Sequence, residues 1–503
     1  MDIANASLLD EATAAAEGMV IAFVSAPKKR TFLVDTGVTP QTIAVLRTRA
    51  KGFSINVVVG DVVALMKDED IGVNVCGVLV QYPDVDGNIK DFGALAETTH
   101  SLGGLVICAS DLLALTKIKP PGEWGADVVV GNSGRFGVPA GYGGPHAAFF
   151  AVTDKLKRKM PGRLIGRSRD AQGNLAYRLS LQSKCVYISS AHFRNIKCVM
   201  ILAREQHIRR EKATSNICTS QALLANMAAM YAVYHGAAGI QRIATKVHQF
   251  TQLFKSAVEF MGYKSINASF FDTVTLDVSV AGNADSVHAC ATEVGINLRH
   301  IDEKHVGITF DESISPDDLV NLLNVFSSAA STKPFTLSDL AEPTASSIPL
   351  ALQRTSEYLP HPVFNKHHSE TEMLRYIHHL ASKDMSLVHS MIPLGSCTMK
   401  LNSTSSMIPL TWPEFSAVHP FAPYDQVKGY HQVLKVRWLS CHCTAPFLMF
   451  CRSWRMIFAR LLDSTLLRCN QILGLLANML VSVLSAHSTI LAAKLTVTSA
   501  SSL

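Results

Sequence analysis

The segment PLGSCTMKLN (393–402) is the strongest local candidate for chemistry in this chain of 503 residues. Its glycine gives a flexible backbone, its small side chains supply hydroxyl and thiol donors, and its lysine supplies a cation. Such donors on a flexible backbone suit close contact with a small polar ligand. We therefore predict a functional role, with a structural capping turn as the alternative. The candidate side chains are Ser396, Cys397, Thr398 and Lys400.

Two further places carry polar side chains that could contact a ligand. His389, in SLVHS, could face the same site, although a histidine satisfied within the core is the simpler interpretation. A basic cluster that precedes a helical pattern at 219–236 could bind a carboxylate. We favour a solvated helix face for that cluster. It comprises His207, Arg209, Arg210 and Lys212.

These groups must be positioned by secondary structure, and the first 132 residues show strand patterns that alternate with helical patterns. Five short apolar runs bounded by turn residues alternate with helical patterns such as 40–50 and 91–103. Apolar strands that alternate with helices predict a parallel sheet covered on both faces, which is a doubly wound α/β fold. The runs are FLVDTG (32–37), INVVVGD (55–61), VCGVLVQYP (75–83), GGLVICASD (103–111) and ADVVVGN (126–132).

The pattern changes after the helix predicted at 219–236. That helix is rich in Ala, Leu and Met with few charges, so we expect it to be largely buried. Helical patterns and short strand-like runs then predict a small α+β domain with an antiparallel sheet. A Ser/Thr/Pro-rich stretch at 327–349 indicates a linker. The expected division is a large domain (1–242), the small domain (243–330), a linker with the start of a second half (331–435), and a tail (436–503).

The formal net charge of +6 gives no support to nucleic-acid binding. Seven basic residues and one acidic residue lie at 435–503, so the preceding residues are formally neutral. Positive charge confined to one end of the chain does not make a phosphate-binding face. Of the 11 cysteines, four lie at 436–503 and two at 183–203, and the other five are scattered without metal-type pairing, which suits unpaired thiols in a reducing compartment. Cys441-His442-Cys443 has no second pair at ligand spacing, so we expect no metal site.

Three segments together resemble the glycine cleavage system P-protein family. They are REQHIRREKATSNICTSQALLANMAAMYAVYHG (204–236), GYGGPHAAFF (141–150) and SLVHSMIPLGSCTMKLNS (386–403). The resemblance covers the chain up to about residue 434, with a break at 183–203. It implies a glycine dehydrogenase (aminomethyl-transferring), which uses pyridoxal phosphate to decarboxylate glycine and passes the aminomethyl group to the lipoyl H-protein. It also implies a homodimer for the full-length family and a mitochondrial matrix location.

The resemblance implies the fold-type I architecture of pyridoxal phosphate transferases, with a large α/β domain and a small α+β domain. Such an enzyme needs a Schiff-base lysine, a carboxylate for the pyridine nitrogen and a cradle for the phosphate. Asp111 stands at the carboxylate position, and Gly134 fills the lysine position in the Gly-rich segment 131–146. We therefore expect a non-catalytic half that does not bind the cofactor covalently. The alternatives are a helix cap for Asp111 and a tight turn for the loop.

By the same resemblance, residues 393–402 open the catalytic half and lie along its active-site cleft. Lys400 is not the Schiff-base lysine, because the family's lysine lies farther on, in a His-Lys pair before a Gly-rich loop. Two functions therefore stay open from the sequence. The chain belongs to an active P-protein enzyme, or it is an incomplete splice product without catalytic activity.

Two segments depart from the family's pattern. Residues 183–203 can be encoded with splice-donor and splice-acceptor sequences, and residues 436–503 can be encoded as family sequence read out of frame. We interpret both as consequences of retained introns, with genuine protein sequence as the alternative, and we expect neither to pack well. The run 470–493 has no charged side chain and is long enough to span a membrane. An out-of-frame origin argues against insertion, so we expect no membrane contact.

The first residues predict a folded helix rather than a targeting peptide. The segment MDIANASLLDEATAAAEGM (1–19) is rich in Ala and carries Asp and Ser residues of the capping type. A mitochondrial transit peptide would be rich in Arg and poor in acids. In the resembled family this stretch lies well inside the chain, so we expect the N-terminus to be truncated.

Overall fold

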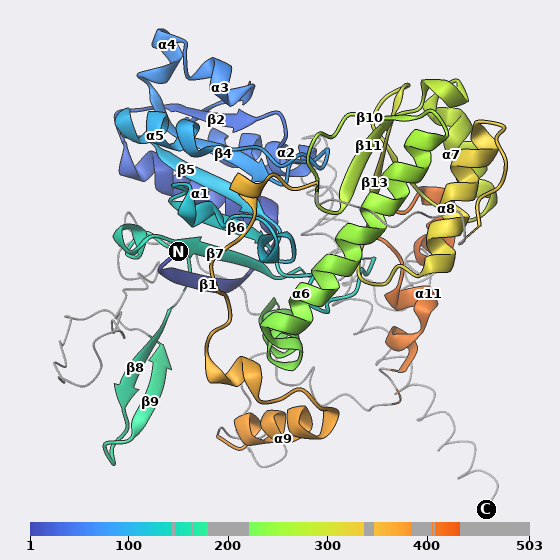
Figure 1. Ribbon diagram of the computed structural model, residues 1–503. Coiled ribbons are helices and arrows are strands. Elements are labelled where there is room, and N and C mark those ends of the chain that lie inside the picture. The colour runs from blue at the N-terminus through green and yellow to red at the C-terminus, as the bar shows by residue number, and fades with distance from the viewer. Residues whose placement is uncertain are drawn as a thin grey trace, which may run out of the picture. The chain divides into compact units, whose positions relative to one another are not determined.

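The described residues fall into two compact units. The first unit comprises residues 1–137 and 146–365, and it contains both of the larger sheets (Figure 1). The second comprises the described residues within 138–145 and 366–432. The segments 183–203 and 436–503 lie outside the described residues. The computed structural model describes residues 1–142, 146–162, 164–179, 221–336, 347–383, 405 and 408–432.

A seven-stranded sheet is the largest element of the first unit. In chain order its strands are β1 (Ile3–Leu8), β2 (Thr31–Asp35), β3 (Asn56–Gly60), β4 (Val75–Tyr82), β5 (Leu105–Ser110), β6 (Val128–Asn132) and β7 (Ala148–Val152). In space the order is β1-β7-β6-β5-β4-β2-β3. Strands β2 to β6 run parallel to one another, whereas β7 lies antiparallel to both β6 and β1. The five predicted apolar runs are confirmed as the parallel strands.

Helices cover both faces of this sheet because its strands carry apolar side chains on both sides. In β2, Phe32 and Val34 belong to one core, and Leu33 between them belongs to the other. Helices α1 (Glu11–Ser25) and α2 (Pro40–Lys51) pack in the first core, and α5 (Gly93–Ser101) packs in the second. The doubly wound arrangement is therefore confirmed. The short helices α3 (Val62–Leu65) and α4 (Glu69–Gly72) follow β3.

Two cysteine side chains lie in the middle of the sheet. Cys76 in β4 and Cys108 in β5 are both 0% exposed. Burial raises the pKa of the Cys76 thiol to about 11 and also raises the pKa of Cys108, because a thiolate would lose its hydration there. Both are free thiols, in agreement with the unpaired cysteines predicted from their spacing.

The first residues form a strand, so the helix predicted from residue 1 is wrong for Ile3–Leu8. Strand β1 pairs with β7 and thereby satisfies backbone groups along that side of the sheet. Helix α1 begins only at Glu11. Asp10 caps it: Asp10 Oδ1 accepts from the Thr13 N–H at 2.8 Å, and Thr13 Oγ1 accepts from the Asp10 N–H at 3.1 Å. The capping pattern is therefore predictive of the helix start, but pairing with a distant strand is invisible to local periodicity.

A second, antiparallel sheet confirms the one predicted for 243–330. Its strands are β10 (Lys264–Ser265), β11 (Thr273–Asp277), β12 (Arg299–His300) and β13 (His305–Thr309), in the order β10-β11-β13-β12. Helices α7 (Ala284–Glu293) and α8 (Pro316–Ala329) contribute to the same core as β11 and β13. A capping box of Ser315 and Asp318 starts α8.

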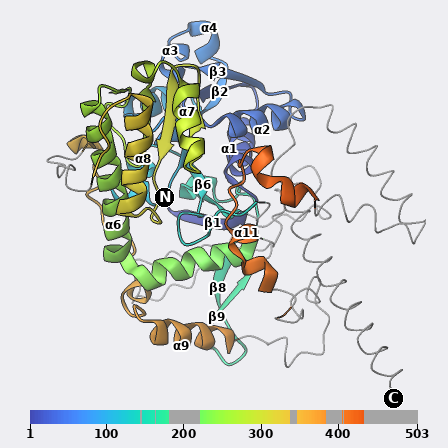
Figure 2. The same cartoon turned by 90° about the vertical axis from the view of Figure 1, so that its right-hand side faces the viewer.

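Helix α6 (Ala222–Phe260) bends at Gly236 (Figure 2). Gly236 has φ 60° and ψ −178°, which interrupts the helical hydrogen bonding. After the bend, buried Ile240 and Phe254 join the core of the small sheet. Before it, Leu224 and Ala228 are buried but Leu223 is 66% exposed, so the first turns are buried on one face only. The domain boundary predicted after residue 242 falls inside this helix, and the division into domains remains a prediction.

The remaining strands and α-helices are few, and short 3-10 helices lie between the elements. A hairpin of β8 (Ile165–Arg169) and β9 (Leu175–Leu179) belongs to the first unit. The second unit contains α9 (Glu370–Ala381) and α11 (Pro413–Ser416), and in it the rings of Tyr142 and Tyr430 lie 5.0 Å apart. Within the described ranges, no helix has both the length and the apolar character needed to cross a membrane.

Candidate functional site

The neighbouring strands β5 and β6 carry the two predicted cofactor-like residues at their carboxyl ends. Asp111 follows β5 directly. Its Oδ1 accepts a hydrogen bond from the Leu113 N–H at 3.1 Å, and its Oδ2 accepts one from the Ala114 N–H at 3.4 Å. These are the contacts of a capping residue, so they support the capping alternative for Asp111.

The Gly-rich loop after β6 is held by its own side chains. Asn132 Oδ1 accepts from the Gly134 N–H at 2.8 Å, and Asn132 Nδ2 lies 3.1 Å from His146 Nδ1. Ser133 Oγ donates to the Ala147 carbonyl at 2.8 Å. These bonds join the two ends of the loop. They support the tight-turn alternative, and the lysine position carries no side chain.

Arg135 extends its guanidinium toward two carboxylates. Its Nη1 lies 2.7 Å from Asp272 Oδ2, and its Nε lies 4.0 Å from Asp111 Oδ2. Asp272 stands just before β11, so this side chain joins the large sheet to the small one. The remaining nitrogen, Nη2, is buried and has no hydrogen-bond partner among the residues that the structure describes. The result is an ion-pair cluster of one cation and two anions.

The charges of this cluster shift one another's pKa. Burial raises the pKa of Asp111, the Arg135 charge lowers it, and the Asp272 charge raises it. Burial lowers the pKa of Arg135, but the two carboxylates raise it more, so the net shift is upward. Arg135 is therefore a permanent cation, as a guanidinium is in nearly every protein environment.

Glu11, in the first turn of α1, adds a carboxyl group to this edge of the sheet. Burial, together with the charges of Asp111 and Asp10, raises the pKa of Glu11 to about 7. Burial lowers the pKa of His146 across the loop. Shifted groups gather at functional sites and also in structural ion clusters, so the shifts alone do not assign a role.

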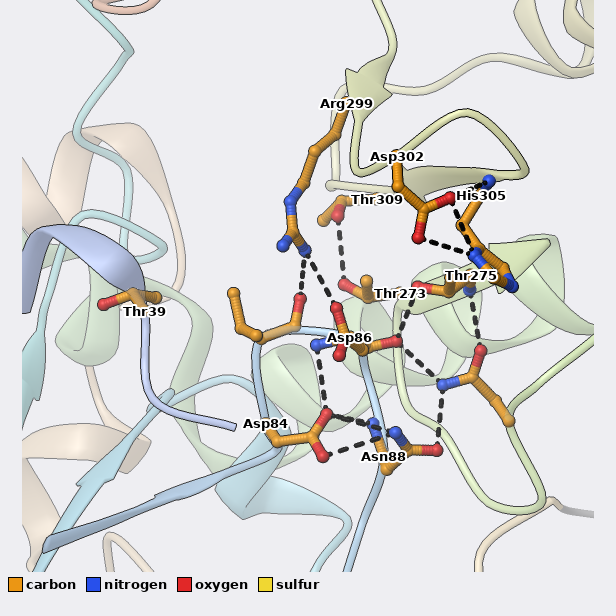
Figure 3. Close-up of polar contacts among 12 residues, drawn as sticks. Thr39, Asp84, Asp86, Asn88, Thr273, Thr275, Arg299, Asp302, His305 and Thr309 are labelled. Atoms are coloured by element: carbon orange, nitrogen blue, oxygen red, sulfur yellow. Dashed lines mark hydrogen bonds and ion pairs between the residues drawn. The ribbon is translucent and has the colours of Figure 1, made fainter. Parts of the chain in front are cut away.

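A polar network holds β11, and with it Asp272, against the large sheet (Figure 3). Asp84 follows β4, and its Oδ1 accepts from the N–H groups of Asp86 at 3.0 Å and Asn88 at 2.8 Å. These bonds fold the loop after β4 into a turn. Thr275 Oγ1, in β11, then donates to the Asp86 carbonyl at 3.1 Å. Asn267 Nδ2 donates to the same carbonyl at 2.8 Å. The network therefore keeps Asp272 within reach of the loop that follows β6.

Gly87 allows that turn to approach β11 closely. Its φ is +94°, and a Cβ there would lie 2.2 Å from the Thr273 carbonyl oxygen. A side chain has no room at this position, so glycine is required. Lys90 completes the turn, because its Nζ lies 3.0 Å from Asp84 Oδ2 and 3.8 Å from Asp35 Oδ2.

Comparison with protein families shows which family the chain belongs to. The model of the glycine cleavage system P-protein matches residues 1–326. This chain belongs to that family. The glycine dehydrogenase (decarboxylating) of Cupriavidus metallidurans is 52% identical over 436 residues, which cover 86% of this chain and 42% of the relative. A putative mitochondrial glycine dehydrogenase (decarboxylating) of Schizosaccharomyces pombe is 49% identical over 449 residues, 86% of this chain and 41% of the relative. The chain thus spans less than half the length of these relatives.

A solved P-protein has a similar structure. It is a glycine decarboxylase of the glycine cleavage system in inhibitor-bound form, with a TM-score of 0.56 and 30% sequence identity. The likeness covers 65% of this chain and 72% of that one. It confirms the predicted fold class, a fold-type I-like large α/β domain with a small α+β domain.

The described residues of this P-protein chain do not fit pyridoxal phosphate at the end of β5. Gly134 cannot form an imine, and the Asp111 carboxylate already faces the guanidinium of Arg135. A pyridine nitrogen would need that carboxylate for itself. We therefore assign no catalytic step to Asp111 or Gly134.

The other predicted site residues lie outside the described residues. The same holds for the basic cluster at 207–212 and for Cys441-His442-Cys443. Within the described ranges, no group of three or more His, Cys, Asp or Glu side chains could hold a metal ion. The candidates of the predicted cleft that lie outside are His389, Ser396, Cys397, Thr398 and Lys400.

Sequence reasoning missed the role of Arg135 beside Asp111. The available signal was a basic side chain inside a Gly-rich turn at a strand end. Asp272 could not be paired with it, because 137 residues separate the two. Glu11 gave no signal either, since an acid in the first turn of a helix is expected from the helix dipole alone.

Proposed function

We propose that the protein acts in the glycine cleavage system as glycine dehydrogenase (aminomethyl-transferring). The complete enzyme would use pyridoxal phosphate to decarboxylate glycine and would pass the aminomethyl group to the lipoyl H-protein. The observation that carries this proposal is the family match over residues 1–326. The relatives named glycine dehydrogenase (decarboxylating), at 52% and 49% identity, support it.

Within that function we assign residues 1–330 to a non-catalytic half. The assignment rests on Gly134 at the lysine position and on Arg135 against Asp111. The side chains of this half join the two sheets to each other, and the chemical steps fall to residues elsewhere. The segment 393–402, with Ser396, Cys397, Thr398 and Lys400, remains the candidate for the edge of that active site, and His389 remains a further candidate.

The proposed partners and location follow from the family. They are glycine as substrate, the lipoyl H-protein as acceptor, a second copy in a homodimer, and the mitochondrial matrix. The Schizosaccharomyces pombe relative, whose name contains the word mitochondrial, supports the location.

A second candidate is a splice product without activity of its own. The departures from the family's pattern at 183–203 and 436–503 favour it. On this alternative the chain would at most pair with a catalytic half supplied by another polypeptide.

Cofactor labelling tests the assignment of the half. The full chain is incubated with pyridoxal phosphate, reduced with borohydride and mapped by peptide. We expect no stoichiometric pyridoxyl label on any lysine within 1–330. A single stoichiometric label there would contradict the non-catalytic assignment.

Glycine-dependent CO2 exchange with lipoylated H-protein tests the function. We expect no exchange from the chain alone, and exchange once the chain is combined with the part of the Cupriavidus relative that it does not match. If the two polypeptides neither associate nor exchange CO2, the proposed function fails.

A further inference from the structure

The guanidinium of Arg135 lies where two separate parts of the fold each supply a carboxylate. Asp111 comes from the end of β5, and Asp272 comes from the entry to β11. The side chains are 25% exposed for Arg135, 25% for Asp111 and 10% for Asp272. Charges removed this far from water need a partner, since the protein interior solvates them poorly.

We propose that Arg135 is an internal ligand of a cation site formed by Asp111 and Asp272, a site that takes a small planar cation of the guanidinium class. Arginine suits such a site because its planar fork carries several donors and can face two carboxylates at once. The proposal rests on the proposed function in one respect: in a non-catalytic half, the Arg135 guanidinium faces the carboxylate that a pyridine nitrogen of the cofactor would otherwise need. The cation site itself follows from the distances and does not require that function.

The backbone around Arg135 is fixed in a way that aims its side chain. The ring of the next residue, Phe136, stacks on Tyr231 of α6 with centroids 5.5 Å apart. The Tyr231 hydroxyl in turn donates a hydrogen bond to Glu312. On the other side, Asn132 holds the Gly134 N–H at 2.8 Å. Because both neighbours are anchored, the guanidinium reaches the two carboxylates with little further ordering.

Removal of the Arg135 side chain should allow a free cation to bind between the two carboxylates. The change Arg135→Ala leaves the Asp111 and Asp272 carboxylates without their cation and opens a space about the size of a guanidinium. A free planar cation can then restore the ion pairs without the covalent link. Its binding would stabilise the folded state, because the unfolded state has no such site.

Thermal unfolding of the full chain with methylguanidinium tests this. The variant Arg135→Ala should melt about 5 °C below the unchanged protein. About 20 mM methylguanidinium chloride, compared with NaCl at equal concentration, should recover about half of that loss, with saturation. The matched control is Arg49→Ala, because Arg49 of α2 pairs with Glu17 but its side chain is 43% exposed. Neither the control nor the unchanged protein should respond.

Two results would overturn the proposal. One is an Arg135→Ala variant that melts with the unchanged protein. The other is a methylguanidinium effect that is absent, or equal in all three proteins. Either result leaves the CO2-exchange and labelling experiments unaffected, so failure here is distinct from failure of the proposed function.

A second variant covers the case in which Arg135→Ala does not fold. The triple change Arg135→Ala, Asp111→Asn and Asp272→Asn removes the carboxylate charges together with the guanidinium. It should fold and should not respond to methylguanidinium, because the cause of instability is unpaired charge. If it also fails to fold, or if it responds to the cation, the site is not a cation site and the proposal falls.

Discussion

Lys90 and Arg135 each face two carboxylates at the carboxyl end of the large sheet. Lys90 Nζ lies 3.0 Å from Asp84 and 3.8 Å from Asp35, and its side chain is 46% exposed. Arg135 lies 2.7 Å from Asp272 and 4.0 Å from Asp111, and its side chain is 25% exposed. The two clusters have the same charges, but the groups that solvate their anions differ.

The backbone solvates the anions beside Lys90. Asp84 accepts from two N–H groups, and Asp35 accepts from the Gly37 N–H at 3.1 Å. Beside Arg135, Asp111 also accepts from two backbone N–H groups, so the difference lies with Asp272. Asp272 accepts from the Arg135 guanidinium and the Thr273 hydroxyl, with no backbone donor to its carboxylate in the described part of the chain. A lost cation should therefore cost little where the backbone already solvates the anion, and much where the cation is itself the main donor.

The largest effect should come from Gly87→Ala, because it breaks the turn that holds the Lys90 cluster together. A Cβ would meet the Thr273 carbonyl oxygen at 2.2 Å in a backbone with φ +94°. We expect a loss of about 3 kcal/mol or more in the free energy of unfolding, measured by urea denaturation. Gly282→Ala is the control, since φ there is +91° and nothing lies within 4 Å of the added Cβ. Equal losses in the two variants would show that close packing of this turn does not matter.

The change Arg135→Gln should rank second. It leaves the Asp111 and Asp272 carboxylates without their cation, and we expect a loss of about 3 kcal/mol in the free energy of unfolding. Urea denaturation is again the measurement, with Arg49→Gln as the surface control at below about 1 kcal/mol. A loss as small as that of the control would show that the Arg135 cluster depends on its cation no more than the Lys90 cluster does.

The change Glu11→Gln should stabilise the protein at high pH. The pKa of Glu11 rises from its ordinary value of 4.5 to about 7 on folding, so the folded state holds its proton more tightly. The stability that Glu11 contributes is therefore present below pH 4.5 and is lost as the pH rises to 7. The variant should gain about 2 kcal/mol at pH 8 and almost nothing at pH 4.5. Melting curves at both pH values check this, with the exposed Glu97→Gln as control, and a gain that does not depend on pH would contradict it.

The smallest effect should come from Lys90→Gln. Because Asp84 and Asp35 keep their backbone donors and the lysine is well exposed, we expect a loss below about 1 kcal/mol. Urea denaturation beside Arg135→Gln gives the direct comparison. A loss similar to that of the arginine variant would mean that backbone solvation does not protect the Lys90 cluster.

The centre of the fold could be predicted from sequence, but its edges could not. The strands β2 to β6 are buried on both faces, and such burial leaves continuous apolar runs that a sequence shows directly. Strand β1 is half exposed and pairs across the chain with β7, and β7 is not among the predicted runs. Their pairing depends on backbone groups, which carry no signal in the side-chain pattern.

The residues of the candidate site also fall into those that could be predicted from the sequence and those that could not. Asp111 and Gly134 were singled out from a strand end and a Gly-rich turn, which are local features, together with the family resemblance. The ion pair of Arg135 with Asp272 was not found, because it depends on how the loop after β4 docks on the small sheet. The same limit applies to Glu11, whose shifted pKa arises from burial beside Asp111.

The rate at which the two buried thiols are modified would measure how often the large sheet opens. Cys76 and Cys108 stand on the adjacent central strands β4 and β5, and both are 0% exposed with raised pKa. An alkylating reagent reacts with accessible thiolates, so it cannot modify either residue until these strands separate. The half-buried Cys290 of α7 reports the small sheet in the same reaction. The relative rates of modification would show whether the two sheets open as one cooperative unit or in succession.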